Sequence, residues 1–239
     1  MRLIVGLLVA VLFVATCRKA IKRVPGVFYA AAIVLVALHL YGTAYGLPVW
    51  LWKTVMFLLQ KNILAFSLFV IVMFLGVLSD GSWLKRALLP IRGELSIIAC
   101  ILSLGHVIVF GTAYLERMAF ARDLLSPFGF LAVAAAVCVV ALMVPLFVTS
   151  FKIVRSRMAA RSWKIVQVFA YPFFLLLFVH LALFVGPSAL QGGWDSRFAM
   201  ATYGFLLLAY VTLRVRKGMR DRKAVSYTHL DVYKRQVPS

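Results

Sequence analysis

Acidic residues are scarce in this chain of 239 residues, which has 7 Asp and Glu against 26 Lys and Arg. The long apolar segments contain no Asp or Glu, so we expect no carboxylate-rich metal site and no proton relay of carboxylates inside a membrane. The three cysteines, Cys17, Cys100 and Cys138, lack the spacing of a zinc site. The sequence also has no internal repeat and no glycine-rich nucleotide-binding motif. Other residue types must therefore carry any chemistry.

Apolar residues dominate the composition. Hydrophobic residues make up 64% of the chain and the mean hydropathy is +1.00, well above the values of soluble domains. Only helices and closed barrels satisfy their backbone hydrogen bonds in lipid, and long continuous apolar runs favour helices. We predict an all-α integral membrane protein, a single helical bundle of six spans plus one extra N-terminal span, with membrane lipid as its surroundings.

The apolar runs give the positions of the predicted spans. They are residues 3–16, 28–45, 62–78, 95–114, 130–147, 165–185 and 199–213. The first run would extend roughly 21 Å as a helix, which is short for a span, so residues 1–23 are predicted to be a signal anchor followed by a basic loop. Residues 24–223 would form the transmembrane bundle. Residues 47–59, with Trp50 and Trp52, are typical of an interfacial segment.

The positive charge of +19 lies in short loops between the apolar runs. This distribution is typical of membrane topology and not of nucleic-acid binding, so no nucleic acid is expected as a partner. With the N-terminus outside, the cytoplasmic side has 18 basic residues and the outer side has 6. The bias predicts a multi-pass protein with a cytoplasmic C-terminus. The predicted cytoplasmic segments are residues 17–23, 80–94, 151–164 and 214–223.

The last sixteen residues differ in character from the rest. Residues 225–236, VSYTHLDVYKRQ, can be back-translated into a self-complementary string that resembles two sequencing-library adapter ends joined head to head. A natural tail has no reason to encode an inverted repeat. We therefore interpret residues 224–239 as an artefactual tail and exclude His229 from the candidate ligands. Whether a native domain follows residue 223 is left open.

Three histidines, His39, His106 and His180, lie inside apolar runs of the native chain. By helical rise they are about 17, 17 and 22 Å from the inner boundary of their spans, which puts them at one depth in the outer half of the membrane. An ionisable side chain in hydrocarbon is costly and normally faces a partner inside the protein. The alternatives are a core histidine bonded to a neighbouring helix, or a ligand.

Haem is the natural occupant of a helical bundle core with two facing imidazoles. Gly105 lacks a side chain where a flat macrocycle would need room, and Phe173, Phe174 and Phe178 could form its walls. The residues alone thus favour a haem iron over a zinc ion, which would need further ligands.

The motifs around two of these histidines resemble the ferric reductase-like transmembrane domain family over residues 28–217. Within it, the likeness is to the haem-binding membrane subunits of bacterial periplasmic methionine-sulfoxide reductase systems. The resemblance implies that His106 and His180 ligate a haem b near the outer face of the bacterial inner membrane. It also implies an outer-side redox partner protein. The motifs are Arg92-Gly93, Thr149-Ser150, Trp163, Tyr171, His180 and the LHLYG segment around His39.

Members of the family often have a second, inner pair of histidines, and here those positions hold Arg92 and Gln167. Neither residue is a good haem ligand, so we expect one haem per chain. Arg92 and Gln167 could instead bind the head group of a flavin (FMN) or a quinone, the electron donor. His39 is expected to contact a haem propionate or ring, to line an outer quinone pocket, or to replace the missing relay as a ligand.

The predicted function is a membrane b-type cytochrome, the electron-transfer subunit of an oxidoreductase, that moves electrons through a bis-histidine haem to an outer-side partner. Two alternatives stay open. One is a transporter or channel with a histidine path for protons or metal ions, and the other is a structural membrane subunit without a cofactor.

Overall fold

The computed structural model describes residues 2–121 and 126–235, with side chains throughout except at 54, 55 and 222–235. All the regular structure in these ranges is helical, which confirms the predicted all-α class. The elements are α1 (Arg2–Arg23), α2 (Pro25–Tyr45), α3 (Val49–Leu51), the π-helix η1 (Trp52–Met56), α4 (Phe57–Gln60), α5 (Ile63–Leu75), α6 (Trp83–Leu88), the 3-10 helix η2 (Leu89–Ile91), α7 (Arg92–Phe120), α8 (Pro127–Ser150), α9 (Lys152–Arg155), α10 (Ala160–Val168), α11 (Ala170–Leu190) and α12 (Trp194–Arg235).

Six helical stretches in the described part are long and apolar enough to cross a membrane. Together they make the chain a multi-pass membrane protein. The first stretch is longer than the sequence predicts, because the helix continues through the basic residues up to Arg23. The stretches are Arg2–Arg23, Pro25–Tyr45, Trp83–Phe120, Pro127–Ser150, Ala160–Leu190 and Trp194–Asp221.

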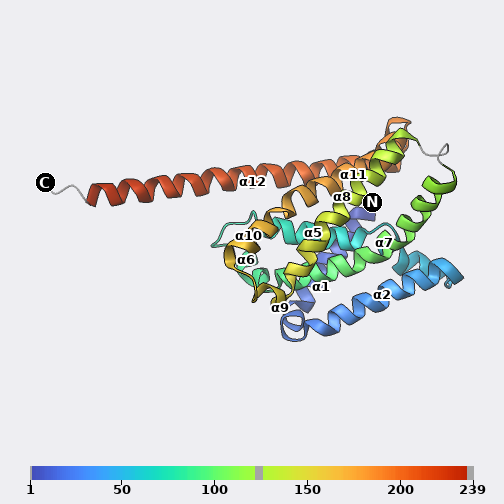
Figure 1. Ribbon diagram of the computed structural model, residues 1–239, viewed down its shortest axis with the longest axis horizontal. Helices are drawn as coiled ribbons and strands as arrows, with labels where there is room; N and C mark the ends of the chain where they lie inside the picture. The colour runs from blue at the N-terminus through green and yellow to red at the C-terminus, as the bar shows by residue number, and fades with distance from the viewer. Residues whose placement is uncertain (1, 122–125, 236–239) are drawn as a thin grey trace.

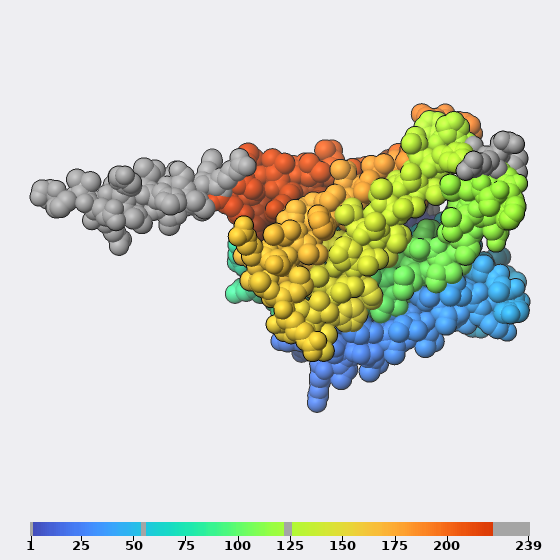
Figure 2. Space-filling model, in the orientation of Figure 1, coloured from blue at the N-terminus to red at the C-terminus, as the bar shows by residue number. Residues whose placement is uncertain are grey.

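Helix α5 forms the centre of the bundle, although it is only 13 residues long. Ten of these residues are buried, on all sides of the helix, as expected for a helix surrounded by others. Helices α1, α7 and α11 pack against it. Gly6 lets α1 come close, because a side chain there would meet Ile63 and Ser67 of α5. Helices α2 and α12 lie on opposite sides of the bundle (Figure 1). On the face turned to the viewer, α8 and α10 lie between α2 and α12 (Figure 2).

The predicted span over residues 165–185 is broken into α10 and α11 at Phe169. Pro172 in the first turn of α11 has no N–H to donate to the carbonyl of Val168, so α10 ends there. As a result Gln167 lies on α10 and His180 on α11.

The predicted cytoplasmic segments gather at one end of the bundle, which we call the basic end. The guanidinium of Arg18, near the end of α1, lies 5.7 Å from the ring centre of Trp83 at the start of α6. Lys152 at the start of α9 is paired with Glu94 in the first turn of α7, with Nζ and Oε1 3.2 Å apart. These contacts join three of the four segments, as the charge distribution predicts.

Glu94 directly precedes the predicted span over residues 95–114 but lies inside the observed helix. Helix α7 begins at Arg92 and not at Leu95, so Glu94 falls inside it and is only 5% exposed. Its charge is compensated by Lys152 and by the positive end of the helix dipole. It therefore marks the boundary of the span and is not a free carboxylate within the membrane.

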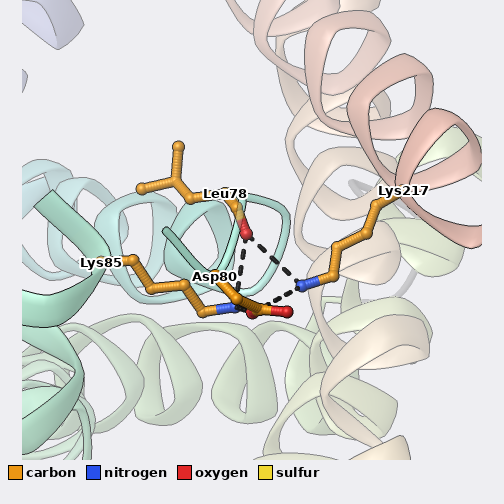
Figure 3. Close-up of polar contacts among 4 residues, drawn as sticks. All are labelled: Leu78, Asp80, Lys85 and Lys217. Carbon is orange, nitrogen blue, oxygen red and sulfur yellow. Dashed lines mark hydrogen bonds and ion pairs between the residues drawn. The ribbon is translucent and has the colours of Figure 1, made fainter. Parts of the chain in front are cut away.

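The fourth basic segment, in α12, is attached through Asp80 (Figure 3). The Asp80 carboxylate accepts a hydrogen bond from Lys85 and lies 3.5 Å from the Nζ of Lys217. Both ammonium groups also donate to the carbonyl of Leu78, at 3.3 and 3.4 Å. The two lysine side chains are 12% and 13% exposed, so one carboxylate balances two largely buried cations.

We predict that Asp80→Asn lowers the melting temperature in detergent more than Lys217→Met does. The first change leaves two neighbouring ammonium groups without their carboxylate, whereas the second keeps the pair of Lys85 and Asp80. The control is Glu116→Gln, because Glu116 is exposed and forms no ion pair in the described part of the chain.

The same cluster has a predicted pH dependence. The hydrogen bond from Lys85 and the charge of Lys217 hold the pKa of Asp80 below its ordinary value of 3.8. The stabilisation is therefore complete at neutral pH and is lost only as the pH falls below about 4. Equal melting temperatures for Asp80→Asn and Glu116→Gln at pH 7 would contradict this role.

Candidate functional site

His106 lies on α7, fourteen residues beyond Arg92, or about 21 Å from the basic end by helical rise. Its Nδ1 lies 3.0 Å from the backbone carbonyl oxygen of Gln60, the last residue of α4. That carbonyl is available because the chain turns at Asn62, whose φ is +56°, before α5 begins. A carbonyl only accepts hydrogen bonds, so Nδ1 carries the proton and Nε2 keeps its lone pair.

His180 on α11 has the same arrangement. Its Nδ1 lies 2.9 Å from the backbone carbonyl oxygen of Ala132 on α8. Ala132 is fully buried, and its small side chain lets α11 approach α8 closely. Nδ1 of His180 therefore also donates, and Nε2 is left as a potential ligand atom. This is the arrangement in which histidine binds metals, with one nitrogen held by a carbonyl and the other free for the metal.

Aromatic contacts connect α7 and α11 beside these two histidines. The rings of Tyr114 on α7 and Phe184 on α11 are 5.3 Å apart, and Phe184 also contacts His180 at 5.1 Å. Phe110 lies one turn beyond His106 on α7, and the centres of their two rings are 4.7 Å apart. Both imidazoles thus lie in apolar, aromatic surroundings in the half of the bundle away from the basic end.

His39 on α2 is the most deeply buried of the three histidines, at 1% exposure. Its ring is tilted against Trp52 of η1, with the centres 6.4 Å apart. Its Nε2 is buried and has no hydrogen-bond partner among the described residues. An unpaired buried polar atom costs free energy, so Nε2 of His39 is able to form one further hydrogen bond.

Gly105 corrects one expectation from the sequence. A Cβ at this position would lie 3.0 Å from Nδ1 of His39, so the space left by the glycine accommodates that imidazole and not an open slot for a macrocycle. The contact brings His39 next to His106 along α7. The structure therefore puts these two histidines at one level, as their helical positions predict.

The phenylalanines expected to wall a haem pack elsewhere. Phe173, Phe174 and Phe178 are at most 5% exposed. Phe173 packs against Phe69 at 5.0 Å, while the other two pack against Phe66 at 6.5 and 5.4 Å. These contacts lie on the side of α11 that faces α5, so the three rings form part of the core of the bundle.

Arg92 and Gln167 come together at the basic end, although they are 75 residues apart in the sequence. Both line a small cavity of about 40 Å³ between α5, α7, α8 and α11, and both line a larger cavity of about 400 Å³ that opens toward α6 and α12. The larger volume is in the range of small-molecule sites. The structure thus brings the two residues of the predicted inner site to one place.

Thr149 at the end of α8 holds α10 in position at this cavity. Its hydroxyl accepts a hydrogen bond from Nε2 of Gln167 at 3.3 Å and donates to the carbonyl of Pro145 at 2.7 Å. Its carbonyl accepts a hydrogen bond from Nε1 of Trp163 at 3.2 Å. These contacts attach α10 to the end of α8.

Sequence reasoning missed two parts of the site. The carbonyls of Gln60 and Ala132 are backbone groups, so no side-chain pattern could indicate them. The other part is the set of cations that line the large cavity with Arg92, which are Lys85, Lys164 and Arg214. The basic loops signalled their presence at one end of the bundle but not their convergence.

Within the described ranges no three His, Cys, Asp or Glu residues gather as a metal cluster. The donor set fits a group that takes two protein ligands, since His106 and His180 each present one unprotonated nitrogen.

Residues 61–178 match the ferric reductase like transmembrane component family. The predicted resemblance to ferric reductase-like proteins is thus confirmed for this range. It includes His106, Arg92 and Gln167, ends two residues before His180, and does not include His39.

An uncharacterized protein of Treponema pallidum (strain Nichols) is 42% identical over 157 residues, which cover 66% of this chain and 43% of that protein. The chain therefore spans less than half the length of this relative. No solved structure matches this chain.

We predict that Gly105→Ala destabilises the protein and that Gly111→Ala does not. The first change inserts a methyl group against His39, and overpacking of this kind costs about 1–3 kcal/mol. Gly111 lies on the same helix with nothing within 4 Å of a Cβ, so alanine there is neutral or stabilises by up to about 1 kcal/mol through helix propensity. Thermal unfolding in detergent measures the difference, and equal stability of both variants would contradict the contact.

Proposed function

We propose that this protein is a membrane b-type cytochrome that transfers electrons through one bis-histidine haem. The observation that supports it most is the shared arrangement of His106 and His180, in which a backbone carbonyl holds Nδ1 and leaves Nε2 unprotonated. Two separate carbonyl partners, from α4 and α8, produce the same ligand-ready tautomer. The match of residues 61–178 to ferric reductase-like transmembrane components supports an electron-transfer role.

In this proposal His106 and His180 would hold a haem b, which would supply one-electron redox chemistry. The chain orients the two imidazoles through the carbonyls of Gln60 and Ala132. The rings of Phe110 and Phe184 pack against them and exclude water. His39 is buried beside Gly105, and its Nε2 has no partner among the described residues. This nitrogen would form a hydrogen bond with a polar group of the cofactor or of a quinone at this level.

Electrons enter, on this proposal, at the basic end, where Arg92 and Gln167 line the large cavity. A flavin such as FMN or a quinone is the donor class, because both offer acceptor oxygens to the guanidinium and the amide. The basic end then faces the cytoplasm of a bacterium, in agreement with the charge count of the sequence.

The histidines lie in the half of the bundle remote from the basic end, so electrons leave toward an outer-side redox partner protein. Motifs such as Trp163 and Thr149-Ser150 favour a partner of the periplasmic methionine-sulfoxide reductase type. The location that follows is the bacterial inner membrane, with the N-terminus outside.

We predict that His106→Ala and His180→Ala each abolish haem binding. Either change removes one of the two imidazoles that would hold the haem in a dry bundle. His39→Ala should retain haem, because the imidazole of His39 is not one of the two ligands. Haem per protein is measured by pyridine haemochrome on folded, monodisperse samples. The ligand assignment is wrong if His106→Ala keeps wild-type occupancy, or if His39→Ala alone loses the haem.

We also predict one haem per chain and not two. Arg92 is permanently charged and offers no lone pair, and the amide of Gln167 is a weak ligand already bonded to Thr149. The ratio of haem to protein, from pyridine haemochrome and amino-acid analysis, should be near one. A ratio near two would mean that another residue completes an inner site.

A further inference from the structure

The large cavity at the basic end has an unusual lining for the interior of a membrane protein. Four cationic side chains from four helices reach it, which are Lys85 of α6, Arg92 of α7, Lys164 of α10 and Arg214 of α12. Asp80 is the one carboxylate among the lining residues. The cavity therefore has a strong excess of positive charge.

The single carboxylate is already in use. Asp80 pairs with Lys85 and with Lys217 (Figure 3). In the described part of the chain, Arg92, Lys164 and Arg214 form no ion pair with a carboxylate. A partly buried cation without a counter-charge is unfavourable, and here two of them, Arg92 and Arg214, border one volume together with the exposed Lys164.

Aromatic side chains also line the cavity. Tyr171 and Trp163 line it, and the guanidinium of Arg214 lies 4.8 Å from the ring centre of Tyr171. Arg92 lies deeper, since it also borders the small inner cavity. Tyrosine and tryptophan are the residues that accumulate at the interface between lipid and water, so the cavity opens near head-group level.

We propose that this cavity binds a phosphate group, with Arg92 as its principal partner. Phosphate has two or three acceptor oxygens that match the planar guanidinium, and its charge compensates the excess of cations. Basic cavities between helices at the inner face are typical sites for anionic lipid head groups. A volume of about 400 Å³ accepts a head group or a mononucleotide.

The phosphate has two possible sources, an anionic phospholipid of the surrounding leaflet or a soluble mononucleotide. Only the second source rests on the proposed function, in which a flavin donates electrons at this site. The site itself follows from charge and volume alone and does not depend on haem.

Two probes separate these sources. Protein in phosphatidylcholine nanodiscs is titrated with FMN and, in parallel, with riboflavin, which lacks the phosphate. In a second series the nanodiscs contain phosphatidylglycerol, and thermal stabilisation reports lipid binding. Preference for FMN over riboflavin identifies the mononucleotide, and stabilisation by phosphatidylglycerol identifies the lipid. If neither probe binds, the proposal is wrong.

Arg92→Gln should weaken binding of the active probe by about ten- to a hundredfold, because a hydrogen-bonded charge pair is lost. Arg157→Gln is the matched control, since Arg157 is an exposed cation at the same end that lines neither cavity. Equal binding in both variants would overturn the proposal. If Arg92→Gln does not fold, Lys164→Gln replaces it, because Lys164 is exposed and its substitution disturbs the fold less. If Lys164→Gln then binds the probe as well as Arg157→Gln does, the cavity is not a phosphate site. Haem content in the same samples tests the proposed function separately.

Discussion

Lipid provides no hydrogen bonds, so each polar side chain within the bundle must find its partner in the protein. His106 and His180 satisfy this constraint through backbone carbonyls of Gln60 and Ala132. The partner determines the chemistry, because a carbonyl can only accept and so forces the proton onto Nδ1. Each of these two histidines thereby keeps a lone pair on Nε2 in apolar, aromatic surroundings. Nε2 of His39 has no hydrogen-bond partner among the described residues.

The same constraint explains the contrast between the two ends of the bundle. At the basic end the charges lie near water, where the ion pair of Glu94 with Lys152 and the cluster around Asp80 can form. Away from that end His106 and His180 lie among aromatic rings. A protein that receives electrons at a charged surface and passes them through a dry core needs this division. In the proposed function the charges would bind and orient polar ligands, and the apolar region would exclude water from the redox centre.

The sequence predicted the class, the approximate helices and the shared level of His39 and His106, because hydropathy and helical rise are properties of contiguous residues. It also indicated that Arg92 and Gln167 belong to one site, through their likeness to a family motif. It could not indicate the carbonyl partners, since backbone acceptors leave no trace in the side-chain pattern. Gly105 was interpreted wrongly for a related reason, because only the packing of α2 on α7 reveals which side chain uses its space.

The central claim is that two imidazoles hold one low-spin haem in this bundle. The visible absorption spectrum of the purified protein, oxidised and then reduced with dithionite, tests it most directly. Two nitrogen ligands predict the Soret band of a b-type cytochrome and a sharp α band on reduction. A folded protein, purified from cells with ample haem, that shows no haem absorption would contradict the account.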